Sequence, residues 1–236
     1  MSMNPTERQA LLEKTVDRIG RMANLVSHGR DDFIKLVHCA ADIEGVEAVF
    51  QRMNERDDDE ALDHLAEIKY GVLFRDLGFF AEFEPTGIKG PDLMVERDQV
   101  SAFVEVKRYR PKEVDSVPES LGRGGTLPTY GGNPAYTQAQ IEKDLLCKIR
   151  QIQPKNGVQH GILAVWSDRS SFENDVFECA VRRIPRKEAK QKGLRFCIFG
   201  SDFVTVGDPK RFYCETVSLP ETPFRRWTED IQGYLG

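Results

Sequence analysis

Apolar residues recur at helical spacing through the first part of the chain. Residues 4–7 read Asn-Pro-Thr-Glu, which combines a capping residue, a proline for the first helical position and a glutamate three residues after the cap. A break is expected at residues 28–31, with further helical segments after it, so we predict a helical extension over residues 1–56. The apolar positions of the first helix are Leu11, Leu12, Val16, Ile19 and Met22.

The acidic residues 57–60 precede another stretch of helical spacing. Carboxylates in a first helical turn complement the helix dipole, so we expect a helix to begin there. We expect it to end at Gly78, because glycine is favoured just after a helix. The alternation of apolar and polar residues at positions 79–84 then predicts a strand.

Residues 90–110, GPDLMVERDQVSAFVEVKRYR, contain two apolar runs separated by a polar break. If Asp98 and Gln99 form a two-residue turn, the segment becomes a hairpin in which Asp92 faces Glu105. A longer turn is an alternative, since Asp-Gln is a weaker turn signal than Asp-Gly. Alternation places five apolar side chains on one face of this hairpin, namely Leu93, Val95, Ala102, Val104 and Val106.

The rest of the chain alternates between predicted helices and strands. Residues 111–135 are rich in proline and glycine and predict a long loop, either a mobile lid or binding loop or a disordered surface insertion. The other predicted elements are a helix from residue 136, a strand at 157–168, a helical stretch at 171–192 interrupted by Pro185, strands at 194–200 and 211–219, and a helix at 225–234. This order predicts an α/β fold with a mixed central sheet flanked by helices, over residues 57–236, behind the helical extension.

Composition narrows the class of protein. The 236 residues carry a net charge of −5, and no apolar run approaches the roughly 20 residues that cross a membrane. The N-terminus lacks the pattern of a secretory signal, so we expect a cytoplasmic protein without a membrane partner. The five cysteines are scattered and are interpreted as small core residues, not as a disulfide framework or a zinc site. The acidic net charge argues against a surface that coats nucleic acid as a whole, but it leaves a local basic groove open.

The hairpin contains the most informative chemistry. In the register above, the side chains of Asp92 and Glu105 start about 5 Å apart. Two carboxylates this close repel unless a cation lies between them or one is protonated, and Mg²⁺ is a natural partner for carboxylate and carbonyl oxygens. The Val106 carbonyl could add an oxygen, and Lys107 could orient water or stabilise negative charge. The alternative is that Glu105 and Lys107 lie on an ordinary solvated strand face.

The residues Pro91-Asp92 and Glu105-Val106-Lys107 resemble the motif of the PD-(D/E)xK nuclease superfamily. The segment LAEIKYGVLFRDLGF, which contains Glu67, looks like the first core helix of that family. The resemblance covers residues from about 60 to 205 and implies a restriction-endonuclease-like fold. It implies phosphodiester hydrolysis, most simply of DNA, by a Mg²⁺-bound water, with Mn²⁺ as a substitute.

The resemblance also implies residue roles. Asp92 and Glu105 would bind the metal with the Val106 carbonyl, Lys107 would be the catalytic lysine, and Glu67 would be an auxiliary metal ligand. The alternative for Glu67 is an exposed helix carboxylate paired with Lys69 or Tyr70. Candidate contacts to nucleic acid are Arg108, Arg110, Lys112, Arg123, Gln138, Gln140 and Lys148.

A second basic cluster occupies the helical stretch near Pro185, and it is either a path for a nucleic-acid backbone or a solvated helix face. Trp166 and Trp227 are interpreted as core or edge aromatics.

The leading hypothesis is a Mg²⁺-dependent nuclease, and the alternative is a non-catalytic module of the same fold that binds nucleic acid or protein. A regulatory or assembly protein that acts through its N-terminal helices is a third hypothesis, and a homodimer through those helices is a further expectation. DNA versus RNA, and duplex versus single strand, stay open.

Overall fold

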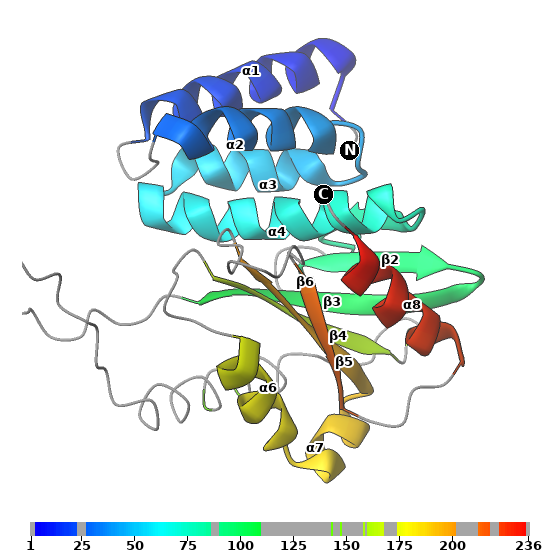
Figure 1. Ribbon diagram of the computed structural model, residues 1–236. Coiled ribbons are helices and arrows are strands. Elements are labelled where there is room, and N and C mark those ends of the chain that lie inside the picture. The colour runs from blue at the N-terminus through cyan, green and yellow to red at the C-terminus, as the bar shows by residue number, and fades with distance from the viewer. Residues whose placement is uncertain are drawn as a thin grey trace, which may run out of the picture.

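Helices cover both faces of a six-stranded sheet in the computed structural model (Figure 1). The structure describes residues 3–22, 27–85, 90–109, 143, 147, 158, 160–167, 174–201, 212–217 and 222–234. Four helices are stacked above the sheet in Figure 1, with the last of them nearest to the strands. They are α1 (Pro5–Arg21), α2 (Ser27–Ala40), α3 (Val46–Glu55) and α4 (Asp58–Asp76).

The local signals of the N-terminal helices are largely confirmed. Asn4 caps α1 by accepting a hydrogen bond from the Glu7 amide, and the Glu7 side chain accepts one from the Asn4 amide in return. The predicted break at residues 28–31 is wrong, because these residues lie inside α2. A glycine inside a helix costs only about 1 kcal/mol. The burial of Val37 and Ala40 on the same helix offsets that cost.

Helix α4 begins and ends where the sequence predicts. The Asp57 side chain accepts a hydrogen bond from the Glu60 amide at 2.8 Å, and the helix is followed by Gly78, whose φ of 79° is easy for glycine alone. On the side facing the sheet, the Tyr70 hydroxyl donates a hydrogen bond to the Val165 carbonyl. Burial raises the pKa of this tyrosine well above its usual value, so the hydroxyl stays protonated and serves as a donor.

The sheet is mixed, which confirms the predicted α/β class. Strands β1, β2 and β3 are antiparallel neighbours, β3, β4 and β5 are parallel, and β6 is antiparallel to β5, in sequential order across the sheet. The strands are β1 (Phe80–Phe83), β2 (Leu93–Arg97), β3 (Val100–Tyr109), β4 (Gly161–Ser167), β5 (Leu194–Ser201) and β6 (Phe212–Thr216). The remaining helices are α6 (Asn174–Arg182), α7 (Arg186–Gln191) and α8 (Thr222–Gly233).

The hairpin register is confirmed. Leu93 pairs with Val104, and Arg97 pairs with Val100, which leaves Asp98 and Gln99 as a two-residue turn. Both turn residues have positive φ, 54° and 64°, as a type I′ turn requires. The turn therefore follows the right-handed twist of the strands although neither residue is glycine.

The two faces of the sheet have separate cores. We call the side against α4 the α4 face and the side against α6 and α7 the α6 face. The five apolar hairpin residues predicted to share a face are all buried on the α4 face, with residues from α1 to α4 and α8. The α6 face has a smaller core, formed by Leu163, Val165, Phe177, Ala180, Val181, Ile184, Ala189, Leu194, Cys197 and Phe199. Trp166 and Trp227 are buried in the larger core, as predicted.

The N-terminal helices are packed into the same hydrophobic core as the sheet. Their link to β1 includes main-chain contact: the Phe83 amide donates to the Glu44 carbonyl at 2.8 Å, and Glu44 forms a bridge with Glu82. Gly45 allows this approach, because a Cβ at that position would lie 2.2 Å from the Phe83 carbonyl oxygen. Within the described residues, no helix is long and apolar enough to cross a membrane.

The cysteines only partly follow the prediction. Cys197 is buried and Cys214 is half-buried, while Cys39, Cys147 and Cys179 are exposed and are not the core residues we expected. Burial raises the pKa of the Cys197 and Cys214 thiols, so both stay protonated near neutral pH.

Candidate active site at the end of the β2–β3 hairpin

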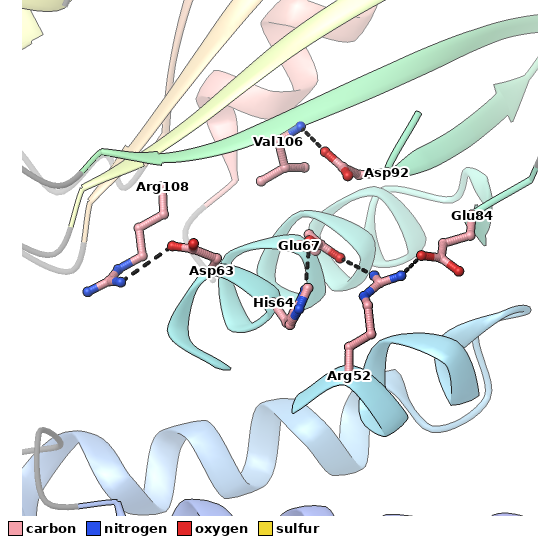
Figure 2. Close-up of polar contacts among 8 residues, drawn as sticks. All are labelled: Arg52, Asp63, His64, Glu67, Glu84, Asp92, Val106 and Arg108. Carbon is pink, nitrogen blue, oxygen red and sulfur yellow. Dashed lines mark hydrogen bonds and ion pairs between the residues drawn. The ribbon is translucent and has the colours of Figure 1, made fainter. Parts of the chain in front are cut away.

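Asp92 joins three strands at the point where the hairpin opens. It lies immediately before β2, and its Oδ2 accepts a hydrogen bond from the Val106 amide of β3 at 2.7 Å (Figure 2). Its main-chain carbonyl accepts a second hydrogen bond from the Glu84 amide, just after β1, at 3.0 Å. The position of this carboxylate therefore depends on both neighbouring strands.

The hydrogen-bonded pairing of β2 with β3 ends at this point because of Pro91, and we call this end of the hairpin the opening. Continuing the register from Leu93 and Val104, Val106 stands opposite Pro91. Opposed residues in an antiparallel pair exchange hydrogen bonds at every second position, so both the N–H and the C=O of Val106 point toward β2. Proline has no amide hydrogen to donate to that carbonyl. The Asp92 carboxylate satisfies the Val106 N–H, and the Val106 C=O points into the same opening.

Glu105 and Lys107 flank Val106 on the α6 face. Val104 and Val106 face α4, so alternation directs the side chains between and after them to the opposite side. Glu105 is only 6% exposed, whereas Lys107 is half-buried. The structure thus brings Asp92 and the Glu105–Lys107 segment together at one end of the hairpin, in the predicted order.

Glu67 lies in a different environment from the exposed carboxylate of the alternative interpretation. It is buried on α4, where Oε2 lies 3.0 Å from Arg52 Nη2 and Oε1 lies 2.9 Å from His64 Nδ1 (Figure 2). The alternative of an exposed carboxylate paired with Lys69 or Tyr70 is wrong. The Lys69 Nζ lies 3.7 Å from the centre of the Trp166 ring, and Tyr70 binds Val165. A metal-binding role for Glu67 stays a prediction.

Arg52 is the residue near the site that sequence reasoning missed. Its guanidinium forms ion pairs with Glu67 and with Glu84, and it lies between these two carboxylates in Figure 2. Glu84 has a φ of 48°, a left-handed conformation that costs a residue other than glycine about 1–2 kcal/mol. No local pattern could reveal these pairs, because they join the N-terminal extension to two elements distant in sequence.

The predicted contacts to nucleic acid are mostly outside the described residues. This holds for Arg110, Lys112, Arg123, Gln138, Gln140 and Lys148, and for the loop at 111–135. Arg108 is described and is buried on the α4 face. Its Nη1 lies 3.1 Å from the Asp59 carbonyl. The same atom lies 3.4 Å from Asp63 Oδ1 (Figure 2). A contact between Arg108 and a phosphate would require it to leave these partners.

The second basic cluster is exposed on helices of the α6 face. Pro185 separates α6 from α7, as the sequence predicts. Arg182 is engaged by Glu178 and by Glu215, the latter at 3.3 Å. The exposed cations of the cluster are Arg182, Arg183, Arg186, Lys187 and Lys190.

The oxygen atoms at the opening fit a hard cation. They comprise the carboxylates of Asp92 and Glu105 and the Val106 carbonyl, which are the ligand types that Mg²⁺ prefers. Mg²⁺ usually keeps several waters, so a site with one or two carboxylates is sufficient. Across the described part of the chain, no group of three or more His, Cys, Asp or Glu side chains is arranged to hold a metal ion. A cation here would therefore depend on the main-chain carbonyl and on water as well as on the acid pair.

Comparison with known proteins adds no assignment. No family model matches the chain, and neither a curated protein nor a solved structure matches it.

Proposed function

We propose that the protein is a Mg²⁺-dependent nuclease that hydrolyses phosphodiester bonds, with DNA as its substrate and Mn²⁺ as a substitute metal. The observation that carries the proposal is the opening of the hairpin, where Asp92 Oδ2 lies 2.7 Å from the Val106 amide beside Glu105 and Lys107. The arrangement of α4, the antiparallel strands β1 to β3 and the parallel strand β4 supports a restriction-endonuclease-like fold. A cytoplasmic location and a homodimer through the N-terminal helices stay predictions.

Each residue has a defined task in this proposal. Asp92, Glu105 and the Val106 carbonyl would hold the cation, which supplies an activated water and offsets negative charge on the phosphate. Lys107 stabilises the charge that develops on the phosphate oxygens. Glu105, Val106 and Lys107 lie on a paired strand, and Asp92 is hydrogen-bonded to that strand, so the sheet holds the spacing of these groups.

The test is cleavage of supercoiled DNA in Mg²⁺, Mn²⁺ or EDTA by the wild type and by Asp92→Asn and Lys107→Ala. Asparagine keeps an oxygen acceptor for the Val106 amide, so Asp92→Asn removes the charge with little change to the fold. We expect both variants to lose at least about 100-fold in cleavage rate. Circular dichroism and thermal unfolding measure whether each variant is folded.

The matched control is Glu96→Gln. Glu96 is an exposed acid of the same hairpin, accepts a hydrogen bond from Ser101 at 2.7 Å and lies away from the opening. We expect this variant to cleave like the wild type. Metal-dependent cleavage that survives both Asp92→Asn and Lys107→Ala would contradict the proposal.

A second candidate function is binding of nucleic acid without hydrolysis. The observation that favours it is that Asp92 already has a structural partner in the Val106 amide and that Glu67 is already paired with Arg52. Fluorescence anisotropy with labelled DNA distinguishes the two. Binding that is unaffected by EDTA, together with no cleavage in either metal, would favour the binding module.

A further inference from the structure

Arg52 brings the N-terminal helices into contact with the segment that carries Asp92. The side chains of Arg52, Glu67 and Glu84 are only 19%, 10% and 11% exposed. Buried charges are costly unless they are paired, and removing one member leaves the others uncompensated. Glu84 depends on this guanidinium for its ion pair, and Glu67 is partnered by it together with His64. The guanidinium pairs with both carboxylates in a forked geometry that lysine cannot reproduce.

Glu84 is the link between Arg52 and the candidate site. Its backbone is in the left-handed region, which persists in residues other than glycine only where neighbouring contacts enforce it. Two contacts do so. The side chain pairs with Arg52, and the amide donates to the Asp92 carbonyl at 3.0 Å. Without the pair to Arg52, Glu84 would relax and its hydrogen bond to Asp92 would weaken.

We propose that Arg52 is a positioning residue that fixes Asp92 through Glu84. The N-terminal helices are then part of the functional centre, since α3 supplies the group that determines where Asp92 lies. His64 contributes by holding the other carboxylate partner of Arg52, Glu67, at 2.9 Å. The catalytic consequence rests on the proposed function, but the structural coupling does not.

The coupling is tested by amide hydrogen exchange measured by NMR. In Arg52→Met, which keeps an unbranched apolar stem but removes the guanidinium and its charge, we expect the Glu84 and Val106 amides to exchange at least about 10-fold faster. Both donate to Asp92, one to its carbonyl and one to its carboxylate. The Phe103 amide, which donates to the His160 carbonyl from the same strand β3, is the internal reference and is expected to keep its rate.

The matched control is Arg56→Met. Arg56 follows α3, is 57% exposed at its side chain and forms a surface pair with Glu60 at 3.5 Å. We expect it to leave the Glu84 and Val106 amides unchanged. Equal exchange rates for these amides in Arg52→Met and the wild type would overturn the proposal, and so would faster exchange that included Phe103 to the same extent.

The functional arm uses DNA cleavage and Mn²⁺ binding. In Arg52→Met we expect kcat to fall about 10-fold or more with KM for DNA nearly unchanged, and Mn²⁺ affinity to fall. Arg52→Lys should recover part of kcat, because it restores one of the two ion pairs. A double-mutant cycle with Glu84→Gln should be strongly non-additive in kcat, whereas additive effects would overturn the link through Glu84.

The two proposals fail separately. If the wild type neither cleaves DNA nor binds Mn²⁺, the proposed function is wrong, and hydrogen exchange alone decides whether Arg52 positions Asp92. If the wild type cleaves and binds metal but Arg52→Met matches it in kcat and in exchange, the positioning role is wrong and the proposed function stands.

Discussion

The three carboxylates in and beside the candidate site have partners that come from other elements of the chain. Asp92 binds the main chain of β3, and Glu67 and Glu84 share an arginine from α3. The effect of each carboxylate on the stability of the folded protein depends on how completely its partner offsets the negative charge. Glu82, on β1, is a contrasting case because its neighbour is another acid.

The first prediction at the residue scale concerns the pH dependence of stability at Glu82. Partial burial, and then repulsion from Glu44, raise the pKa of Glu82. A carboxyl whose pKa is higher in the folded state is destabilising once ionised, so stability is greatest below about pH 4.3 and falls as the pH rises through the folded pKa. Glu82→Gln should therefore raise the melting temperature at pH 7. The corresponding gain in the free energy of unfolding is less than about 1 kcal/mol, because the site is partly solvated. The gain should vanish near pH 4.

Glu44→Gln is the matched variant for this measurement. It leaves the main-chain contact between Glu44 and Phe83 intact while removing the repulsion. We expect it to reproduce part of the gain, and we expect the double variant to add less than the sum of the two. Parallel curves of melting temperature against pH for wild type and Glu82→Gln would contradict this account.

Sequence reasoning reached some of these residues and not others for a physical reason. Asp92, Glu105 and Lys107 could be placed relative to one another because the period of a strand and a two-residue turn determine the register. Arg52 could not be found, because its partners are chosen by the packing of α3 against α4 and β1. Nothing in the residues around Arg52 encodes that packing.

At the scale of elements, the approach of α3 to β1 depends on Gly45. Gly45 and Gly78 have nearly the same left-handed φ, 78° and 79°, but very different surroundings. A Cβ at position 45 would meet the Phe83 carbonyl oxygen at 2.2 Å, whereas nothing lies within 4 Å of one at position 78. Comparing substitutions at these two glycines therefore separates the energetic cost of a left-handed φ from the cost of a steric clash with Phe83.

We predict that Gly78→Ala lowers the free energy of unfolding by about 1–2 kcal/mol, which is the cost of a left-handed alanine. Gly45→Ala should cost a further 1–3 kcal/mol or so, because α3 and β1 must also move apart. Chemical denaturation of both variants measures the difference. Equal destabilisation by the two substitutions would show that α3 and β1 can move apart at little energetic cost.

The predicted elements succeed where the signal is local. The capping box of α1, the acidic start of α4 and the division of α6 from α7 at Pro185 all depend on residues next to one another in sequence. The break expected at residues 28–31 fails because packing of α2 outweighs the intrinsic cost of Gly29. Propensity is a weak guide where a helix has a buried face.

At the scale of the whole molecule, the two faces of the sheet differ in access. The α4 face is covered by α1 to α4 and by α8, while Glu105 and Lys107 point to the α6 face. Helices α6 and α7, which carry exposed cations, lie on that same side of the sheet (Figure 1). If nucleic acid is the partner, its backbone should approach across the α6 face, although the net charge of the protein is −5.

Salt dependence of DNA binding tests this direction of approach. Replacing Arg186, Lys187 and Lys190 by glutamate should weaken binding and reduce the slope of log K against log salt by roughly 0.9 for each phosphate that is no longer neutralised. Lys14→Glu with Lys35→Glu, on α1 and α2 at the far side of the molecule, is the control and should have a much smaller effect. A slope that is unchanged by the α7 substitutions would mean that these cations are only a solvated helix face.

The contact between residue 44 and β1 also has a consequence for self-association. β1 is an outermost strand of four residues, and alternation directs the main-chain groups of only Ala81 and Phe83 outward. The Phe83 amide is already used by Glu44, and the next residue, Glu84, is left-handed and donates its amide to the Asp92 carbonyl. Short, partly covered borders of this kind resist the addition of a foreign strand. Two molecules are therefore not expected to associate by extending one continuous sheet across the β1 edge.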